Sequence, residues 1–354
     1  GWMMDWIIQR MKSVSKNERY SKPEKSPSIK LDANENVVLD RIFLSQLAMV
    51  EANKIDLRKY PLDLYDKLYE SLSKYLNVGE KNLLIGNGSD QIIELLLTFI
   101  GNGKRVTLPT PTFSYFVSRC QLHGIKILKI PLLPESNTFE RRLFMSSAKN
   151  SQLVYLCSPN NPTGNQLDRS IIQEILELKD VLVILDEAYV EFAKYSMTRS
   201  VEKYDNLVIL RTFSKAFGLA GSRIGYFISN KRFSKFIRTN VQSPYPVNSL
   251  SLALAISVIS NVQKIKECVD LIKRERQRLY ERISKMDWII TYQSDANFIF
   301  IRCKRKYKSI INSLRSHGIG VKELGELHGY GKCIRITVGT PEMNDATISA
   351  LNDT

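Results

Sequence analysis

The sequence is poor in the residues that build metal sites and disulfide frameworks. It has three histidines and five cysteines, and no HExxH or CxxC spacing joins any of them. An odd number of widely separated cysteines does not predict a disulfide framework, and free thiols are typical of a reducing cytosol. We therefore expect no metal site and a cytoplasmic location.

Long apolar runs are also absent. The longest candidates, residues 92–100 and 252–259, are interrupted or bounded by polar residues, whereas a membrane-spanning helix needs about 18–20 apolar residues. Near the start of the chain Asp5 interrupts the apolar residues, and no small-residue cleavage site follows, which is not typical of a signal peptide. No membrane partner is predicted.

Charge of one sign is in excess, because 51 Lys and Arg stand against 36 Asp and Glu, a net charge of +15. Such an excess is compatible with nucleic acid, an anionic membrane surface or acidic metabolites as partners. The basic residues are scattered, however, and the densest runs, residues 273–278 and 302–308, are interleaved with apolar positions. This pattern favours solvated faces over a nucleic-acid groove.

The 354 residues, 44% of them hydrophobic, suggest roughly two domains at about 150 residues each. Short apolar strands alternate with helical patterns over residues 83–226, which indicates an α/β domain with a mainly parallel sheet. The candidate strands are nearly continuous apolar runs at residues 105–108, 126–130, 153–157, 181–185, 207–210 and 224–228. A helical tract over residues 248–285 and strands near residues 297–301 and 333–338 predict a second, small α+β domain.

Polar residues follow three of these strands where each strand ends. Residues 158–164 have the sequence Ser-Pro-Asn-Asn-Pro-Thr-Gly, which turn formation alone explains. Asp186 lies at the carboxyl end of a predicted strand, where it either binds a ligand beyond the end of the sheet or caps its own strand. Lys215 lies between hydroxyl and apolar residues, and partial desolvation there lowers the pKa of an amine and favours Schiff-base chemistry.

A helix start is the remaining candidate. Residues 86–90, Gly-Asn-Gly-Ser-Asp, lead into the apolar helical segment 92–99. Free N–H groups and the positive end of the helix dipole suit a phosphate there, and plain capping by Ser89 or Asp90 is the alternative. The segment is not a P-loop, because GxxxxGK[ST] is absent.

The ordered set Asn161, Asp186, Tyr189, Lys215 and Arg223 resembles the fold-type I pyridoxal-phosphate (PLP) aminotransferases. The strings are most like the histidinol-phosphate aminotransferase group, and they are residues 31–36, 60–61, 88–90, 111–113, 161–164, 212–215 and 335–340. From about residue 20 onward the chain follows this pattern. The resemblance implies a large PLP-binding domain at residues 61–244, a small domain from both chain ends at residues 36–60 and 245–354, and an N-terminal arm at residues 1–35.

The resemblance also implies a cofactor site. Lys215 forms the internal aldimine and then moves the proton between Cα and C4′, while Asp186 pairs with the ring nitrogen. The other cofactor-binding residues are Ser89, Asp90, Thr212, Ser214 and Arg223 at the phosphate, Asn161 and Tyr189 at the phenolic oxygen, and Phe113 on the ring face. Tyr60 matches a tyrosine that the neighbouring subunit contributes in the family, which implies a homodimer.

On the substrate side, Arg335 matches the family arginine that binds the substrate α-carboxylate. Asn34 and Tyr20 are further candidates for substrate binding. Where the group usually has an arginine for the substrate phosphate, the sequence has Lys322, which keeps the charge but lacks the forked donors.

We therefore expect a PLP-dependent aminotransferase that converts histidinol phosphate and 2-oxoglutarate to imidazole acetol phosphate and glutamate. The alternatives are a threonine-phosphate decarboxylase, an aromatic amino acid aminotransferase and, in another class, a non-catalytic regulatory relative that binds nucleic acid. The expected partners are small molecules and a second copy of the chain.

Overall fold

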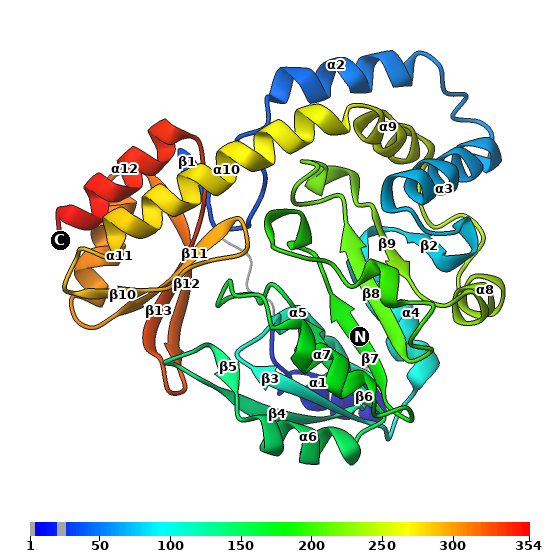
Figure 1. The fold of residues 1–354 in the computed structure, drawn as a ribbon, viewed down its shortest axis with the longest axis horizontal. Helices are drawn as coiled ribbons and strands as arrows, with labels where there is room; N and C mark the ends of the chain where they lie inside the picture. Colours follow the sequence, from blue (N-terminus) through cyan, green and yellow to red (C-terminus); the bar gives the residue numbers. More distant parts are fainter. Residues whose placement is uncertain (1–3, 20–25) are drawn as a thin grey trace.

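The larger of two β-sheets forms the centre of the molecule (Figure 1). The computed structural model describes residues 4–19 and 26–354, and within them this sheet has eight strands. Their order is β2 (Leu83–Gly86), β9 (Gly225–Ile228), β8 (Leu207–Thr212), β7 (Leu182–Asp186), β6 (Leu153–Cys157), β3 (Arg105–Thr110), β4 (Lys126–Leu133) and β5 (Thr138–Phe139). The five strands from β8 to β4 are parallel, and the pairs β2–β9, β9–β8 and β4–β5 are antiparallel. The predicted fold class, α/β with a mainly parallel sheet, is confirmed.

Helices bury the larger sheet on both faces. One face packs against α4 (Gly88–Ile100), α5 (Ser114–Leu122) and α8 (Lys231–Asn240), and we call it the α4 face. The opposite face, the α3 face, packs against α3 (Leu62–Leu76), α6 (Arg141–Lys149), α7 (Arg169–Leu176) and α9 (Ser249–Ser260). Because side chains alternate along a strand, Asp186 and Thr212 point to the α4 face and Arg211 points to the α3 face.

The smaller sheet joins residues from both ends of the chain (Figure 1). Its order is β1 (Ile29–Leu31), β12 (Ile319–Leu327), β13 (Gly331–Thr337), β11 (Phe298–Cys303) and β10 (Ile289–Thr291). β1 pairs parallel with β12, and the other pairs are antiparallel. The remaining helices are α1 (Asp5–Val14), α2 (Arg41–Ala52), α10 (Val262–Ile283), α11 (Tyr307–Ser316) and α12 (Pro341–Asn352).

Two details differ from the sequence-based expectation. The helical tract over residues 248–285 is two helices, because α9 ends at Ser260 and α10 begins at Val262, after Asn261. Residues 29–31, inside the expected arm, form a strand whose Leu31 is fully buried. The limits given above for the arm and the two domains stay a prediction.

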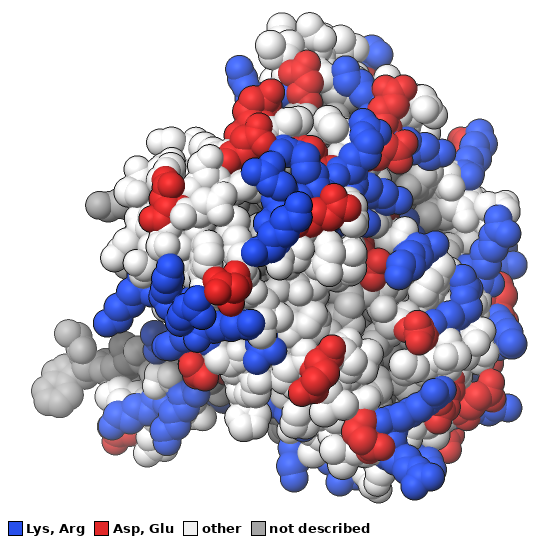
Figure 2. Space-filling view, turned by 60° about the vertical axis from the view of Figure 1, so that its left-hand side comes forward, with Lys and Arg blue, Asp and Glu red and all other residues white. Residues whose placement is uncertain are grey.

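Basic and acidic side chains are interspersed on the surface. Figure 2 shows Lys and Arg spread over one face with Asp and Glu among them, and several form ion pairs, such as Arg278 with Glu275 and Asp345. None of the helices formed by residues 4–19 and 26–354 is both long and apolar enough to cross a membrane.

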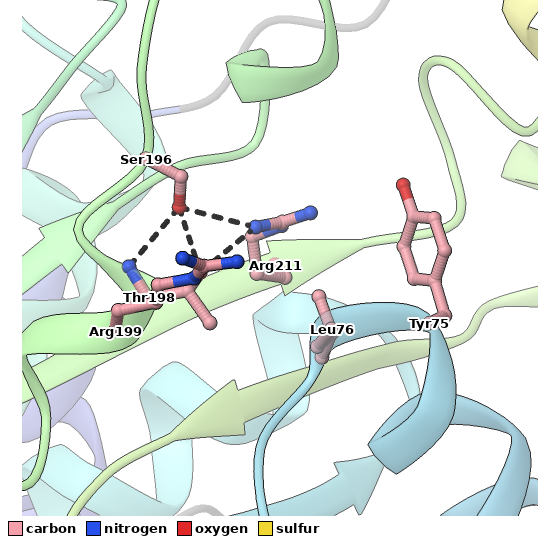
Figure 3. Close-up of a pocket in the computed structure, with 6 residues that line it drawn as sticks. All are labelled: Tyr75, Leu76, Ser196, Thr198, Arg199 and Arg211. Carbon is pink, nitrogen blue, oxygen red and sulfur yellow. Dashed lines mark hydrogen bonds between the residues drawn. The ribbon is translucent and has the colours of Figure 1, made fainter.

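A buried ion cluster lies on the α3 face of β8, directly behind the strand end that leads to Lys215. Arg211 Nη1 lies 3.4 Å from Glu187 Oε1, and its Nη2 lies 3.1 Å from Glu191 Oε2. The guanidinium also borders a cavity of about 340 Å³, where it donates to the hydroxyl of Thr198 (Figure 3). Burial raises the pKa of Glu187, and raises that of Glu191 to about 7. Arg211 therefore compensates the charge of two carboxyl groups that are almost fully removed from solvent.

We predict that Arg211→Met lowers the free energy of unfolding by roughly 3–5 kcal/mol at pH 8, because it leaves buried carboxylates without a cation. The loss should shrink towards pH 6, where protonation removes the uncompensated charge. Urea unfolding at both pH values measures it. The matched control is Arg199→Met, an exposed arginine that lines the same cavity, with an expected change within about 0.5 kcal/mol. Equal stability of the two variants would contradict the role of Arg211.

Candidate active site

The carboxyl ends of β6, β7 and β8 meet at one edge of the larger sheet, because these strands are parallel. Asp186 ends β7 and is buried. Its Oδ2 accepts a hydrogen bond from the Tyr155 hydroxyl at 2.7 Å, and its Oδ1 accepts one from the Ala188 N–H at 3.1 Å. Burial raises the pKa of Asp186 to about 6, against the lowering effect of both hydrogen bonds. A carboxylate at this edge is therefore ionised at neutral pH and held in a fixed orientation.

Lys215 lies in the loop that follows β8 and is partly buried. Its Nζ donates a hydrogen bond to the Ala33 carbonyl oxygen at 2.9 Å and lies 5.8 Å from the centre of the Tyr189 ring. Burial lowers the pKa of Lys215 to about 8, and the positive charge of Arg335 adds to this effect. This amine therefore loses its proton more readily than a solvent-exposed lysine does, as nucleophilic chemistry requires.

The start of α4 and the loop after β8 form an anion-binding corner. Arg223 donates to the Ser214 hydroxyl and to Asp90 Oδ2, both at 3.3 Å. Ser89 and Asp90 lie in the first turn of α4, where backbone N–H groups have no helical partner. A Cβ at Gly88 would lie 2.8 Å from Arg223 Nη2. The absence of a side chain there lets the guanidinium approach the helix start, and this combination of donors fits a phosphate.

Thr212 supports this corner in a way that the sequence did not suggest. Its hydroxyl oxygen accepts a hydrogen bond from the Ser214 N–H at 2.9 Å, so it shapes the loop in addition to any contact with a phosphate. Burial raises the pKa of the Asp90 carboxyl, while Arg223 and Lys215 oppose that rise.

Residues of the smaller sheet close the site from the other side. Arg335 of β13 is buried, and it donates to Asn161 Oδ1 at 2.6 Å and to the Asp32 carbonyl oxygen at 2.7 Å. Asn34 donates from Nδ2 to the Tyr189 hydroxyl at 3.0 Å and accepts a hydrogen bond from Thr337. Four residues predicted from separate motifs, Asn34, Asn161, Tyr189 and Arg335, are thus brought together.

Lys322 lies beside Arg335, because the two residues pair directly between β12 and β13. Burial lowers the pKa of Lys322, and the charge of Arg335 lowers it further. Two neighbouring cations at a partly buried position favour an anionic ligand, since an anion stabilises both charged forms.

Three further residues that the sequence predicts for the site are not linked to the residues above by the contacts described. Phe113 precedes α5, with its ring centre 5.8 Å from that of Tyr115, and its stacking on a cofactor stays a prediction. Tyr60 is 74% exposed and stacks on Tyr245 at 4.5 Å. Tyr20 lies outside the described residues.

Sequence reasoning missed Tyr155. Its position in β6, two residues before Cys157, places its side chain on the α4 face with Asp186. The alternation of a strand could have indicated this face, but the hydroxyl contact depends on the register between two strands, which the sequence does not define.

The chain is similar to known proteins over almost its whole length. Residues 26–351 match the family model for aminotransferase class I and II. The chain is 34% identical to histidinol-phosphate aminotransferase of Thermoanaerobacter pseudethanolicus over 353 residues, covering 98% of each chain. It is 35% identical to the enzyme of the same name from Pyrococcus furiosus over 337 residues, covering 95% of each.

The structure is also similar to that of a solved protein. The crystal structure of histidinol-phosphate aminotransferase from Sinorhizobium meliloti in complex with pyridoxal-5'-phosphate matches with a TM-score of 0.85 and 23% identity. The match covers 96% of this chain and 95% of that one. At this identity the likeness shows the fold.

Proposed function

Because the chain belongs to the class I and II aminotransferases, we propose that its amino donor is histidinol phosphate and its acceptor 2-oxoglutarate. The products are then imidazole acetol phosphate and glutamate. The chain is a PLP-dependent aminotransferase, and the two relatives compared above carry the name of this reaction. The observation that carries the proposal is the junction of Lys215, Arg335 and Lys322, where an amine with a lowered pKa lies beside two cations that suit anionic substrates.

The residues at the sheet edge fit PLP as cofactor. Ser89, Ser214 and Arg223 would hold its phosphate, and Asp186 would accept a hydrogen bond from its protonated ring nitrogen. Asn161 and Tyr189 would donate hydrogen bonds to its phenolic oxygen. When bound, PLP supplies an electron sink that stabilises negative charge on the substrate Cα.

Lys215 performs two tasks in this proposal. As an amine whose pKa is lowered by burial, Lys215 would hold the cofactor covalently before the substrate arrives. Once the substrate is bound, the same Nζ would be the base that removes the proton from the substrate Cα and returns it to C4′ of the cofactor. A pKa near 8 suits both tasks, because the amine then accepts and releases a proton at working pH.

Arg335 and Lys322 divide the recognition of anionic groups. The guanidinium of Arg335 binds the α-carboxylate of glutamate or 2-oxoglutarate with two parallel N–H groups. These N–H groups give up their hydrogen bonds to Asn161 and to the Asp32 carbonyl oxygen when the carboxylate binds. Lys322 binds the phosphate of histidinol phosphate as a single charge. A phosphate beside Lys322 favours its charged form, which burial disfavours.

A substrate panel tests the proposed reaction. We expect glutamate formation from histidinol phosphate and 2-oxoglutarate, with kcat/KM roughly 100-fold above that for phenylalanine, because phenylalanine has no phosphate for Lys322 to bind. Threonine phosphate should release no carbon dioxide. The control, Lys215→Ala, should lose turnover by several orders of magnitude.

Other results of the panel would replace the proposal. Carbon dioxide from threonine phosphate indicates the decarboxylase, and equal turnover of phenylalanine indicates an aromatic aminotransferase. Salt-dependent DNA binding without cofactor uptake indicates the regulatory alternative.

Lys322→Ala should raise KM for histidinol phosphate roughly 10- to 100-fold, as expected for the loss of one charged hydrogen bond. KM for 2-oxoglutarate should change little. The matched control is Lys304→Ala, which removes an exposed lysine and should change neither value. An equal loss for both substrates would remove Lys322 from the phosphate site.

The site is proposed to be completed by Tyr60 of a second copy of the chain. Tyr60 is strongly exposed, and so are Leu57 and Leu62, its near neighbours in the sequence. Large apolar side chains exposed close together in the chain are typical of a surface that a partner covers, and this exposure supports the homodimer.

Mixed dimers test this contribution. Tyr60→Ala and Lys215→Ala subunits should each give weakly active homodimers. Exchange of the two should restore roughly one quarter of wild-type activity, because half of the dimers are hybrids and each hybrid has one intact site. If Tyr60 serves its own subunit, mixing restores nothing.

A further inference from the structure

One buried tyrosine is bonded to the carboxylate of the site but takes no part in the mechanism above. Tyr155 is fully buried in β6, and its hydroxyl lies 2.7 Å from Asp186 Oδ2. In the parallel pairing of β6 with β7, Cys157 lies opposite Asp186 and Tyr155 opposite Ile184. The Tyr155 hydroxyl therefore reaches the Asp186 carboxylate from a position two residues before the end of β6, inside the sheet and away from its carboxyl edge.

Packing fixes the ring that carries this hydroxyl. Tyr155 stacks on Phe116 of α5, with ring centres 3.8 Å apart and an angle of 8° between the planes. Both side chains are fully buried in the core of the α4 face. The hydroxyl can move little, so it defines where Oδ2 of Asp186 lies.

The direction of this hydrogen bond follows from burial. Burial, with the nearby Asp186 charge, raises the pKa of Tyr155 well above that of a free phenol, so the hydroxyl stays protonated and donates a hydrogen bond to the carboxylate. Oδ1 of Asp186 takes the Ala188 N–H. Each oxygen of the Asp186 carboxylate thus has one fixed hydrogen-bond donor. The remaining lone pairs can accept a hydrogen bond from a third donor.

We propose that Tyr155 is a positioning residue that orients the Asp186 carboxylate and keeps it negatively charged, so that the proton shared with the cofactor stays on the ring nitrogen. This inference rests on the proposed placement of Asp186 against that nitrogen.

The groups around Asp186 show why a donor is needed. The titratable groups that act on Asp186 are a phenol and a thiol from β6, a carboxyl from α4, and two neighbours in its own segment, of which Glu187 lies on the α3 face: Tyr155, Cys157, Asp90, Glu187 and Tyr189. Asp90 and Glu187 raise the pKa of Asp186 through like charge, and burial raises it most. The hydrogen bonds from Tyr155 and from the Ala188 N–H oppose these effects, because they stabilise the charged carboxylate and lower its pKa.

The direct test is Tyr155→Phe, which removes the hydroxyl and keeps the stacked ring. The enzyme is reconstituted with PLP labelled with ¹⁵N in the ring, and the nitrogen signal reports whether that atom carries the proton. Without the donor the pKa of Asp186 rises, so the signal should move towards the unprotonated position. A change of one pKa unit corresponds to about 10-fold, and kcat should fall by that factor with KM almost unchanged.

The acid limb of the kcat profile gives a second readout. Asp186 is charged above its pKa, so a raised pKa moves the limb to higher pH in Tyr155→Phe. Replacement of Tyr155 by 3-fluorotyrosine, a more acidic phenol and a stronger donor, should move the limb to lower pH. If Tyr155→Phe does not fold, the fluorotyrosine protein decides alone, and an unmoved limb overturns the proposal.

Two controls separate the possible failures. Tyr69→Phe removes a buried hydroxyl on the α3 face, which accepts the Ile85 N–H, and should leave the nitrogen signal and the acid limb unchanged. Asp186→Asn should leave the nitrogen unprotonated. If Asp186→Asn keeps the wild-type signal, the proposed site fails. If Tyr155→Phe keeps the wild-type nitrogen signal but Asp186→Asn does not, the proposed role of Tyr155 is wrong, and the proposed contact of Asp186 with the ring nitrogen is unaffected.

Discussion

Removal from water of one amine and one carboxyl group, at the same edge of a parallel sheet, governs the chemistry of this protein. Burial brings the pKa of Lys215 down to about 8 and that of Asp186 up to about 6. Between these values the carboxylate is charged and the amine is partly free, which is the combination that PLP chemistry needs. The fold supplies the burial, because β7 and β8 end together and helices cover both faces of the sheet.

The second constraint is the junction between the two sheets. Arg335 of β13 is bonded to Asn161, which follows β6 of the larger sheet, and Asn34 joins Tyr189 to Thr337. These buried polar contacts bind the smaller sheet to the cofactor edge, so that its cations face the amine. Buried polar groups of this kind specify one arrangement, because alternatives would leave them unpaired.

The sequence predicts the positions of several candidate site residues at strand or helix ends, because these residues lie in short contiguous motifs. The Lys215 loop, the start of α4 and the turn after β6 each lie within a few residues, and all of them occur at strand or helix ends in the structure. The strands at residues 153–157 and 207–210 were also found, because an apolar run bounded by turns is a local signal. Tyr155, the Arg211 cluster and the β1–β12 pair depend on contacts between segments far apart in the chain. The break at Asn261 was missed, because a single residue interrupts an otherwise helical pattern.

The central claim is that Lys215 is the amine to which the cofactor attaches, and reductive trapping tests it most directly. The enzyme is saturated with PLP, treated with borohydride to reduce the carbon–nitrogen double bond, digested, and mapped by mass spectrometry. The account predicts one reduced cofactor per chain, on the peptide that contains Lys215. A cofactor trapped on another lysine, with Lys215 unmodified, would contradict it.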